Sequence, residues 1–140
     1  MDETTMNKNN HYEQTTHDIS VLVIPEYLED QSDPDEGRYV WAYHVRIENK
    51  GEGTAQLLTR HWRITDANGT VQEVRGPGVI GEQPVLGPGD SFEYTSGTPL
   101  VTPSGFMEGS YQMTTPDGTH FDIAVPAFSL DSPHAPTRIH

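Results

Sequence analysis

The sequence contains no cysteine and no long apolar run. Because none of its 140 residues is a cysteine, the chain cannot form a disulfide, a thiolate nucleophile or a cysteine zinc site. Hydrophobic residues make up 33% and the mean hydropathy is -0.63, and no stretch approaches the run of about 20 apolar residues that a membrane helix needs. The first eighteen residues lack the apolar core of a secretory signal. We therefore expect a cytoplasmic protein.

Basic residues are also scarce. Eight lysines and arginines stand against 21 aspartates and glutamates, which gives a formal net charge of -13. Ten of the acids lie in the first 36 residues, together with a single base. Such a chain repels the phosphate backbone of nucleic acids and anionic lipid surfaces. We therefore expect neither nucleic acid nor a membrane as a partner.

Helical periodicity is missing, and an alternation of period 2 takes its place. In residues 39–49 the odd positions from Tyr39 to Ile47 are apolar or aromatic, whereas His44, Arg46 and Glu48 fall on the even side. This alternation is typical of a half-buried strand. The pair Asn68-Gly69 is favoured in hairpin turns. Seven segments fit a strand: 19–27, 39–49, 56–66, 71–75, 92–95, 105–115 and 120–130.

Seven short strands without a helix predict an all-β chain. The favoured architecture is an immunoglobulin-like or fibronectin type III-like β-sandwich of seven to eight strands, and a small closed barrel is the alternative. We expect a disordered acidic tail at 1–17, one β-sandwich domain at 18–131 and a flexible C-terminal tail at 132–140. The side chains expected in the core are Trp41, Tyr43, Val45, Trp62, Ile64, Tyr111, Met113, Phe121 and Ile123.

Five motifs resemble the ApaG family. They occur in order and without a large gap over residues 18–130, and the resemblance implies a fibronectin-type β-sandwich. The motifs are NKG at 49–51, LLTRHW at 57–62, VRGPGVIGEQP at 74–84, FEYTSG at 92–97 and MEGSYQM at 107–113.

The resemblance also implies a function. Related domains occur in eukaryotic F-box proteins and in a polymerase-interacting protein, which suggests a non-enzymatic interaction or regulatory module with an unknown protein partner. The bacterial family is commonly labelled a cobalt/magnesium efflux protein. A chain without a membrane span cannot itself form an efflux pathway, so any link to cobalt resistance or magnesium efflux is expected to be indirect. We expect no cofactor, and a monomer or weak homodimer.

Residues 76–81 read GPGVIG and match the pattern G-x-G-x-x-G. In dinucleotide-binding folds this pattern works because a helix N-terminus follows it. No helix is expected here, Pro77 has no N–H, and Glu82 adds a carboxylate. A structural turn and an anion site or partner loop both remain open. The candidate residues are Arg75, Gly76, Gly78, Val79, Ile80 and Gly81.

The same loop defines the alternative function, a binder or enzyme of pyrophosphate or nucleotide-type metabolites. The connection 76–90 is far longer than the usual 4–6 residues or so. We expect it to be ordered by some of Val79, Ile80, Val85 and Leu86, with the others forming a partner surface beside Arg75. Pyrophosphate and nucleotides are then expected to bind more weakly than about 1 mM.

No metal site and no catalytic residue are expected. The sequence has neither G-x-S-x-G nor H-E-x-x-H. His44 and His61 should both point outward; they would face each other only if their strands formed a hairpin, whereas a fibronectin-type order places them in different sheets. Arg60 interrupts the apolar alternation between Leu58 and Trp62. It pairs with a buried acid, caps the sandwich or takes part in binding.

Overall fold

The computed structural model describes residues 11–135. These residues form nine strands and two short 3-10 turns. The elements are β1 (Tyr12–Thr16), β2 (Ile19–Tyr27), η1 (Glu29–Gln31), η2 (Pro34–Glu36), β3 (Tyr39–Asn49), β4 (Ala55–Asp66), β5 (Val71–Pro77), β6 (Val85–Leu86), β7 (Ser91–Leu100), β8 (Ser104–Thr114) and β9 (His120–Asp131). Within residues 11–135, no helix has the length and hydropathy needed to cross a membrane.

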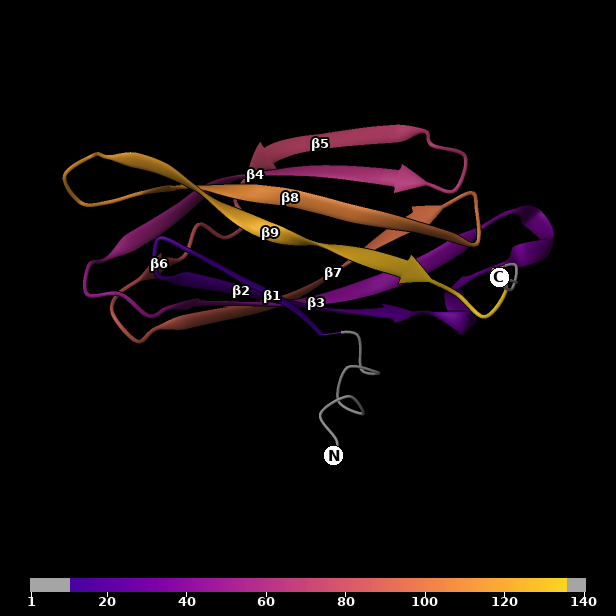
Figure 1. The fold of residues 1–140 in the computed structure, drawn as a ribbon, viewed down its shortest axis with the longest axis horizontal. Helices are drawn as coiled ribbons and strands as arrows, with labels where there is room; N and C mark the ends of the chain where they lie inside the picture. Colours follow the sequence, from indigo (N-terminus) through magenta and orange to yellow (C-terminus); the bar gives the residue numbers. More distant parts are fainter. Residues whose placement is uncertain (1–10, 136–140) are drawn as a thin grey trace, which may run out of the picture.

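The strands form two antiparallel sheets packed face to face. One sheet has the order β1-β2-β3-β7, and the other has the order β5-β4-β8-β9, with β6 paired to β4. Figure 1 shows the two sheets as separate layers. The predicted β-sandwich is therefore confirmed. Beyond the seven expected strands it contains β1 and β6, and β7 continues to Leu100 instead of ending at Thr95.

The core lies between the two sheets and is centred on Trp62. Its ring centroid is 5.4 Å from that of Tyr43, 6.2 Å from that of Tyr111 and 6.1 Å from that of Phe128. The expected core residues are buried, apart from Phe121, which is half-buried. Phe121 lies next to the first residue of β9, and its ring packs on that of His17.

A β-bulge in β4 changes which side chains face the core. The register between β4 and β8 shifts between Leu57 and Thr59. Leu57 is fully buried and Leu58 is only half-buried, so the expectation that Leu58 shares the inner face of Trp62 is wrong. The extra residue in the bulge moves the alternation by one position. Arg60 comes after the bulge and two residues before Trp62, so it keeps the phase of Trp62 and lies on the inner side of β4.

Both predicted tails are partly ordered. Residues 12–16, expected in a disordered tail, form β1 and pair with β2. The interpretation as a tail was wrong there because an edge strand is held mainly by backbone hydrogen bonds and needs little apolar sequence. Near the other end, Ser132 Oγ donates a hydrogen bond of 2.7 Å to Pro103 O. Residues 1–10 and 136–140 lie outside the described residues.

The two sides of the sandwich differ. On one side β1 lies against β9: Ala124 N donates to Thr16 Oγ1 at 3.2 Å, and the rings of Tyr12 and Phe128 are 6.2 Å apart. The opposite side ends in β5 and β7, and no further strand pairs with either of them within residues 11–135. We call these the closed side and the open side.

Candidate functional site at the glycine-rich loop

The glycine-rich loop follows β5 and makes a tight turn. Val79 N donates to Glu82 O at 2.9 Å, and Glu82 N donates to Val79 O at 2.8 Å. The two residues between them, Ile80 and Gly81, have φ angles of 42° and 80°. This is the geometry of a two-residue hairpin turn with both central residues in the left-handed region. The loop is therefore a β-turn and does not lead into a helix.

Gly78 is required by close packing of the loop on itself. Its φ is 61°, and a Cβ at this position would lie 2.4 Å from Glu82 O. Gly78 N donates to Leu58 O at 2.8 Å, so this amide and that of Val79 are both used inside the fold. Pro77 has no amide hydrogen. An anion cradle needs several free N–H groups that converge, and half of this motif cannot supply them.

Arg60 of β4 holds the loop from inside the sandwich. Its Nη1 donates to Pro77 O and to Gly78 O, both at 2.9 Å. The guanidinium lies under Gly76, where a Cβ would be 3.1 Å from both Nη1 and Nη2. Of the roles left open for Arg60, the observed one is closest to a cap, and its partners are carbonyls instead of a buried acid. Position 76 therefore has little room for a side chain, because the Arg60 guanidinium lies directly beneath it.

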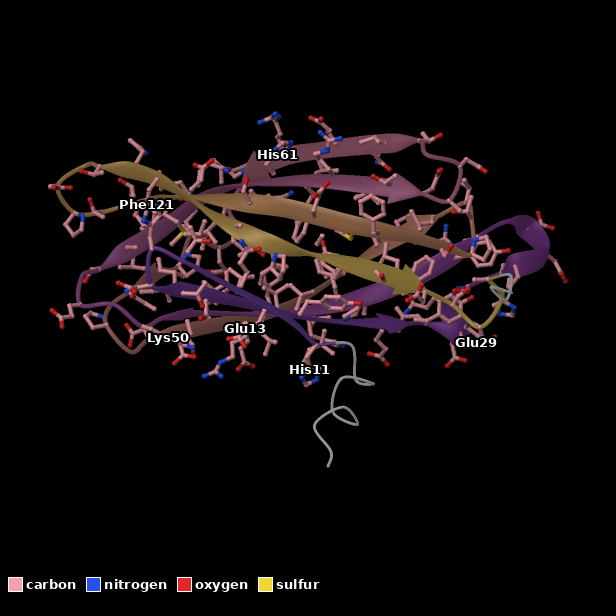
Figure 2. All side chains as sticks on the ribbon, in the orientation of Figure 1. His11, Glu13, Glu29, Lys50, His61 and Phe121 are labelled. Carbon is pink, nitrogen blue, oxygen red and sulfur yellow. The ribbon has the colours of Figure 1, made fainter. Side chains whose placement is uncertain are left out.

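Arg75 points away from this loop. Its side chain is 71% exposed, and its Nη2 lies 3.8 Å from Glu73 Oε1. The Glu73 carboxylate also lies 3.3 Å from His61 Nε2 and 3.8 Å from Arg63 Nη1. We call His61, Arg63, Glu73 and Arg75 the basic cluster. It lies on the outer face of β4 and β5, where Figure 2 shows His61 directed away from the opposite sheet.

The loop contains four apolar side chains, of which two are buried and two are exposed. Val79 and Leu86 are buried, whereas Ile80 is 58% and Val85 59% exposed. The expectation that some of these four residues order the loop against the sheet is confirmed. The six candidate residues are neighbours in the sequence but do not converge on one point, because the Arg75 side chain lies on the outer face of β5 whereas that of Val79 is buried. A partner surface beside Arg75 stays a prediction.

The two strand histidines lie in different sheets, as a fibronectin-type order predicts. His44 is on β3, where its Nδ1 is 2.8 Å from Thr95 Oγ1 and its Nε2 is 3.0 Å from Glu26 Oε1. His61 is on β4 of the other sheet. Within residues 11–135, no group of three or more histidines, aspartates or glutamates is placed to hold a metal ion. The absence of a tight metal site in the whole chain stays a prediction.

Four hollows on the surface of the described residues lie away from the candidate loop. Their volumes lie between about 340 and 610 Å³, and none of these four is lined by residues 75–81. The hollow of about 610 Å³ lies between the start of β5 and the end of β7, with Arg38, Ile64 and Val101 in its lining.

Comparison with known proteins identifies the family. The model of the ApaG domain matches residues 29–115. The chain belongs to the ApaG family. Protein ApaG of Rhodospirillum centenum is 67% identical over 127 residues, 91% of this chain and 98% of that protein. Protein ApaG of Paramagnetospirillum magneticum is 67% identical over 129 residues, 92% of this chain and 99% of its own length.

A solved ApaG-type structure has the same fold. The crystal structure of the ApaA protein from Bordetella pertussis is 49% identical, covers 86% of this chain and 98% of its own, and superposes with a TM-score of 0.81. The C-terminal domain of wzt, at 12% identity and a TM-score of 0.53 over 92% of this chain and 80% of that one, shares the fold alone. The ApaG family is thus shown by sequence and by structure.

Sequence reasoning missed the position of Arg60 and the basic cluster. The signal for Arg60 was its charge in an apolar alternation, but its partners became visible only with the fold. For the cluster the signal was weaker. Three of the eight lysines and arginines, Arg60, Arg63 and Arg75, lie in the two segments that form β4 and β5, and these segments pair through the turn at Asn68-Gly69.

Proposed function

We propose that this ApaG-family chain is a non-catalytic protein-interaction module. It acts in the cytoplasm and binds its partner through the loop and β5 edge beside Arg75. A link to cobalt resistance and magnesium efflux is then indirect and runs through the partner. The observation that carries this proposal is the pair Ile80 and Val85, two exposed apolar side chains on a loop whose backbone is fixed from both sides.

The rigidity of the loop supports a binding role. Arg60, the turn at Val79–Glu82 and the buried Leu86 hold the loop before any partner arrives. A pre-organised surface loses less conformational entropy when it binds. Apolar side chains beside an exposed arginine match the composition of protein interfaces, in which arginine is enriched. The surface is therefore suited to a protein partner.

The same geometry argues against the anion-binding alternative. Pro77 lacks an N–H, the amides of Gly78 and Val79 are occupied, and Arg60 is engaged by two carbonyls. Arg75 already faces Glu73 on the outer side of the sheet. An anion at the loop would have to displace internal hydrogen bonds, each of which has a net worth of about 0.5–1.5 kcal/mol.

A photo-crosslinking experiment tests the proposal. A photoreactive residue is placed at position 80 of the full chain, and in a matched control at Val101, which is 70% exposed at the other end of the sandwich. In a lysate of the source cell, we expect a discrete crosslinked protein from position 80 and not from position 101. With the photoreactive residue placed at the exposed Glu82, the otherwise unchanged chain should give the same product and the double variant I80S/V85S should lose it.

Two outcomes would contradict the proposal. Identical crosslinking from positions 80 and 101 would show that the loop has no selective partner. Retention of the same product by I80S/V85S would show that the exposed apolar pair does not contribute to binding.

A further inference from the structure

The register of β4 and β5 defines which backbone groups face the open side. Gly78 N donates to Leu58 O, and at the other end of the pair Asp66 N donates to Thr70 O at 3.0 Å. In an antiparallel pair, residues that exchange hydrogen bonds alternate with residues that do not. Leu58 and Gly78 belong to the same hydrogen-bonded series as Arg60 and Gly76, which lie opposite each other in the register. Even-numbered residues of β5 therefore direct their amides toward β4.

The odd-numbered residues of β5 direct their backbone groups away from β4. These are Val71, Glu73, Arg75 and Pro77, and no strand pairs with this edge within residues 11–135. Pro77 fits this series, since proline in a sheet is confined to positions whose N–H is not needed by the ladder. The amides and carbonyls of Val71, Glu73 and Arg75 thus form a short row that a further strand can pair with.

The charge beside this edge is unusual for the molecule. The basic cluster contains two arginines and a histidine around the carboxylate of Glu73. The outer face of the other sheet is more acidic, because Arg46 there lies near both Glu48 and Glu93. Glu108 of β8 lies opposite Arg63 in the register, so the two arginines stand beside two carboxylates on this face. In a chain with a net charge of -13, the side chain of Arg75, 71% exposed, is the cationic group that an acidic segment would meet at the β5 edge.

The other edges are less suited to an added strand. β1 and β9 lie against each other on the closed side. The outer edge of β7 is also unpaired within the described residues. Asn49 N donates to Asp90 O at 2.9 Å, just before β7, so the even-numbered residues of β7 bond to β3. The odd-numbered residues, which include Glu93 and Pro99, therefore direct their backbone groups away from β3.

The outward series of β5 also contains a carboxylate and a proline, Glu73 and Pro77, so these features do not separate the two edges. What separates them is charge: β7 contains no arginine or lysine, whereas β5 contains Arg75.

We propose that β5 binds an extended acidic segment of a partner protein as an additional strand of the β5-β4-β8-β9 sheet. This inference rests on the proposed function and specifies the chemistry of the partner. Backbone hydrogen bonds to Val71, Glu73 and Arg75 hold the segment, as in other cases of strand addition. Its acidic side chains on the outer face lie next to Arg75, and its alternate side chains turn inward beside Val74.

A peptide titration tests the mode of binding. The probe is the blocked heptapeptide Thr-Glu-Val-Glu-Val-Glu-Thr, whose glutamates share one face of a strand, added to the ¹⁵N-labelled full chain. We expect saturable binding tighter than about 1 mM, with the amides of Val71, Glu73 and Arg75 shifted and protected from exchange. The same peptide with lysine for glutamate, and an N-methylated version, should bind at least about 10-fold more weakly.

Variants of the chain give a second measurement. Arg75→Ala with Arg63→Ala should weaken the acidic peptide at least about 5-fold, whereas Arg46→Ala on the other sheet should leave its affinity unchanged. Glu73→Pro removes one of the edge amides, so it should abolish the peptide-dependent protection of the β5 amides. If this variant does not fold, the affinities of the arginine variants still decide the question.

Several results would overturn the inference. They are equal binding of the lysine peptide, shifts confined to β7, or a concentration-dependent dimer in which two copies of β5 pair and exclude the peptide. If the peptide fails while the selective crosslink from position 80 persists, strand addition is wrong and the interaction module stands. If both fail, both proposals are wrong.

Discussion

The closed and open sides of the sandwich differ in the groups that they present: side-chain contacts between the sheets on the closed side, and unpaired backbone groups of an edge strand on the open side. On the closed side, side chains join the sheets: Tyr12 packs on Phe128, and Thr16 accepts a hydrogen bond from Ala124 N. On the open side, the odd-numbered residues of β5 leave their backbone groups unpaired within the described part of the chain. Arg60, on the inner face of β4, donates hydrogen bonds to the loop carbonyls of Pro77 and Gly78. Burial of large side chains stabilises the fold, whereas a free strand edge adds little stability and is available for binding. The difference suggests that stability and recognition reside on separate sides.

The largest effect should come from the aromatic cluster behind the closed side. Phe128→Ala removes a buried ring that packs on Tyr12, Tyr43 and Trp62. We expect a loss of about 3–5 kcal/mol in the free energy of unfolding. Val71→Ala, on β5 of the open side and 42% exposed, should change it by less than about 0.5 kcal/mol. Urea unfolding followed by tryptophan fluorescence measures both, and similar losses would contradict the division between the sides.

The next effect concerns the tyrosines that bridge the sheets from β7 to β8. Burial raises the pKa of Tyr94 and of Tyr111, whose hydroxyls are 2.6 Å apart, well above the ordinary value of about 10. The unfolded chain therefore loses these protons at lower pH than the folded chain. Their contribution to stability is complete below about pH 10 and falls as the pH rises further.

Alkaline unfolding measures this effect. The urea midpoint of the wild type should fall steeply above about pH 10. The double variant Y94F/Y111F removes both titrating groups together, so its midpoint should fall less steeply over the same range. A wild-type midpoint that is constant up to pH 12 would show that the two hydroxyls are not shielded in the folded protein.

The glycine-rich loop should respond according to position. Gly78→Val places a Cβ against Glu82 O at a φ of 61°, and we expect a loss of about 2 kcal/mol. Gly81→Asn is the matched control: its φ is 80°, and a Cβ there meets nothing within 4 Å. Asparagine tolerates this conformation, so the loss should stay below about 1 kcal/mol. Equal losses would show that the turn, and not its packing on Glu82, requires glycine.

A smaller effect is expected for the arginine beneath the loop. Arg60→Met keeps most of the apolar stem but leaves Pro77 O and Gly78 O without their donor, which should cost about 1–2 kcal/mol. Arg75→Met at the exposed position should cost less than about 0.5 kcal/mol. Hydrogen exchange of the Val79 and Glu82 amides should accelerate only in Arg60→Met. Faster exchange in both variants would contradict the capping role of Arg60.

The smallest expected effect is that of anions. Isothermal titration with pyrophosphate or ATP should give no saturable heat below about 1 mM, because the loop offers few free amides and Arg60 is already engaged. Micromolar binding that is lost in folded Arg75→Ala would reverse this conclusion and establish the metabolite-binding alternative.

Local pattern was enough for most of the strands and for the fold class. Alternation in β3 is visible in the sequence because one face of the strand is buried and the other is not. β1 was missed because its polar residues carry no such signal, and its pairing with β2 depends on the backbone. β7 was predicted too short because Gly97 and Pro99 have low strand propensity, although an edge strand tolerates both.

By itself, then, the sequence determined that the chain is a β-sandwich with Trp62 and Tyr111 inside, and it indicated the family. Tertiary structure alone decided that Leu57 and not Leu58 enters the core, because a bulge at Leu57/Thr59 shifts the alternation by one residue and no local rule places that bulge. It also decided that the partners of Arg60 are the carbonyls of Pro77 and Gly78. Finally, it decided that β5 is left at an edge beside the basic cluster. Edges depend on the order of strands across the sheet, and that order comes from contacts between segments far apart in the chain.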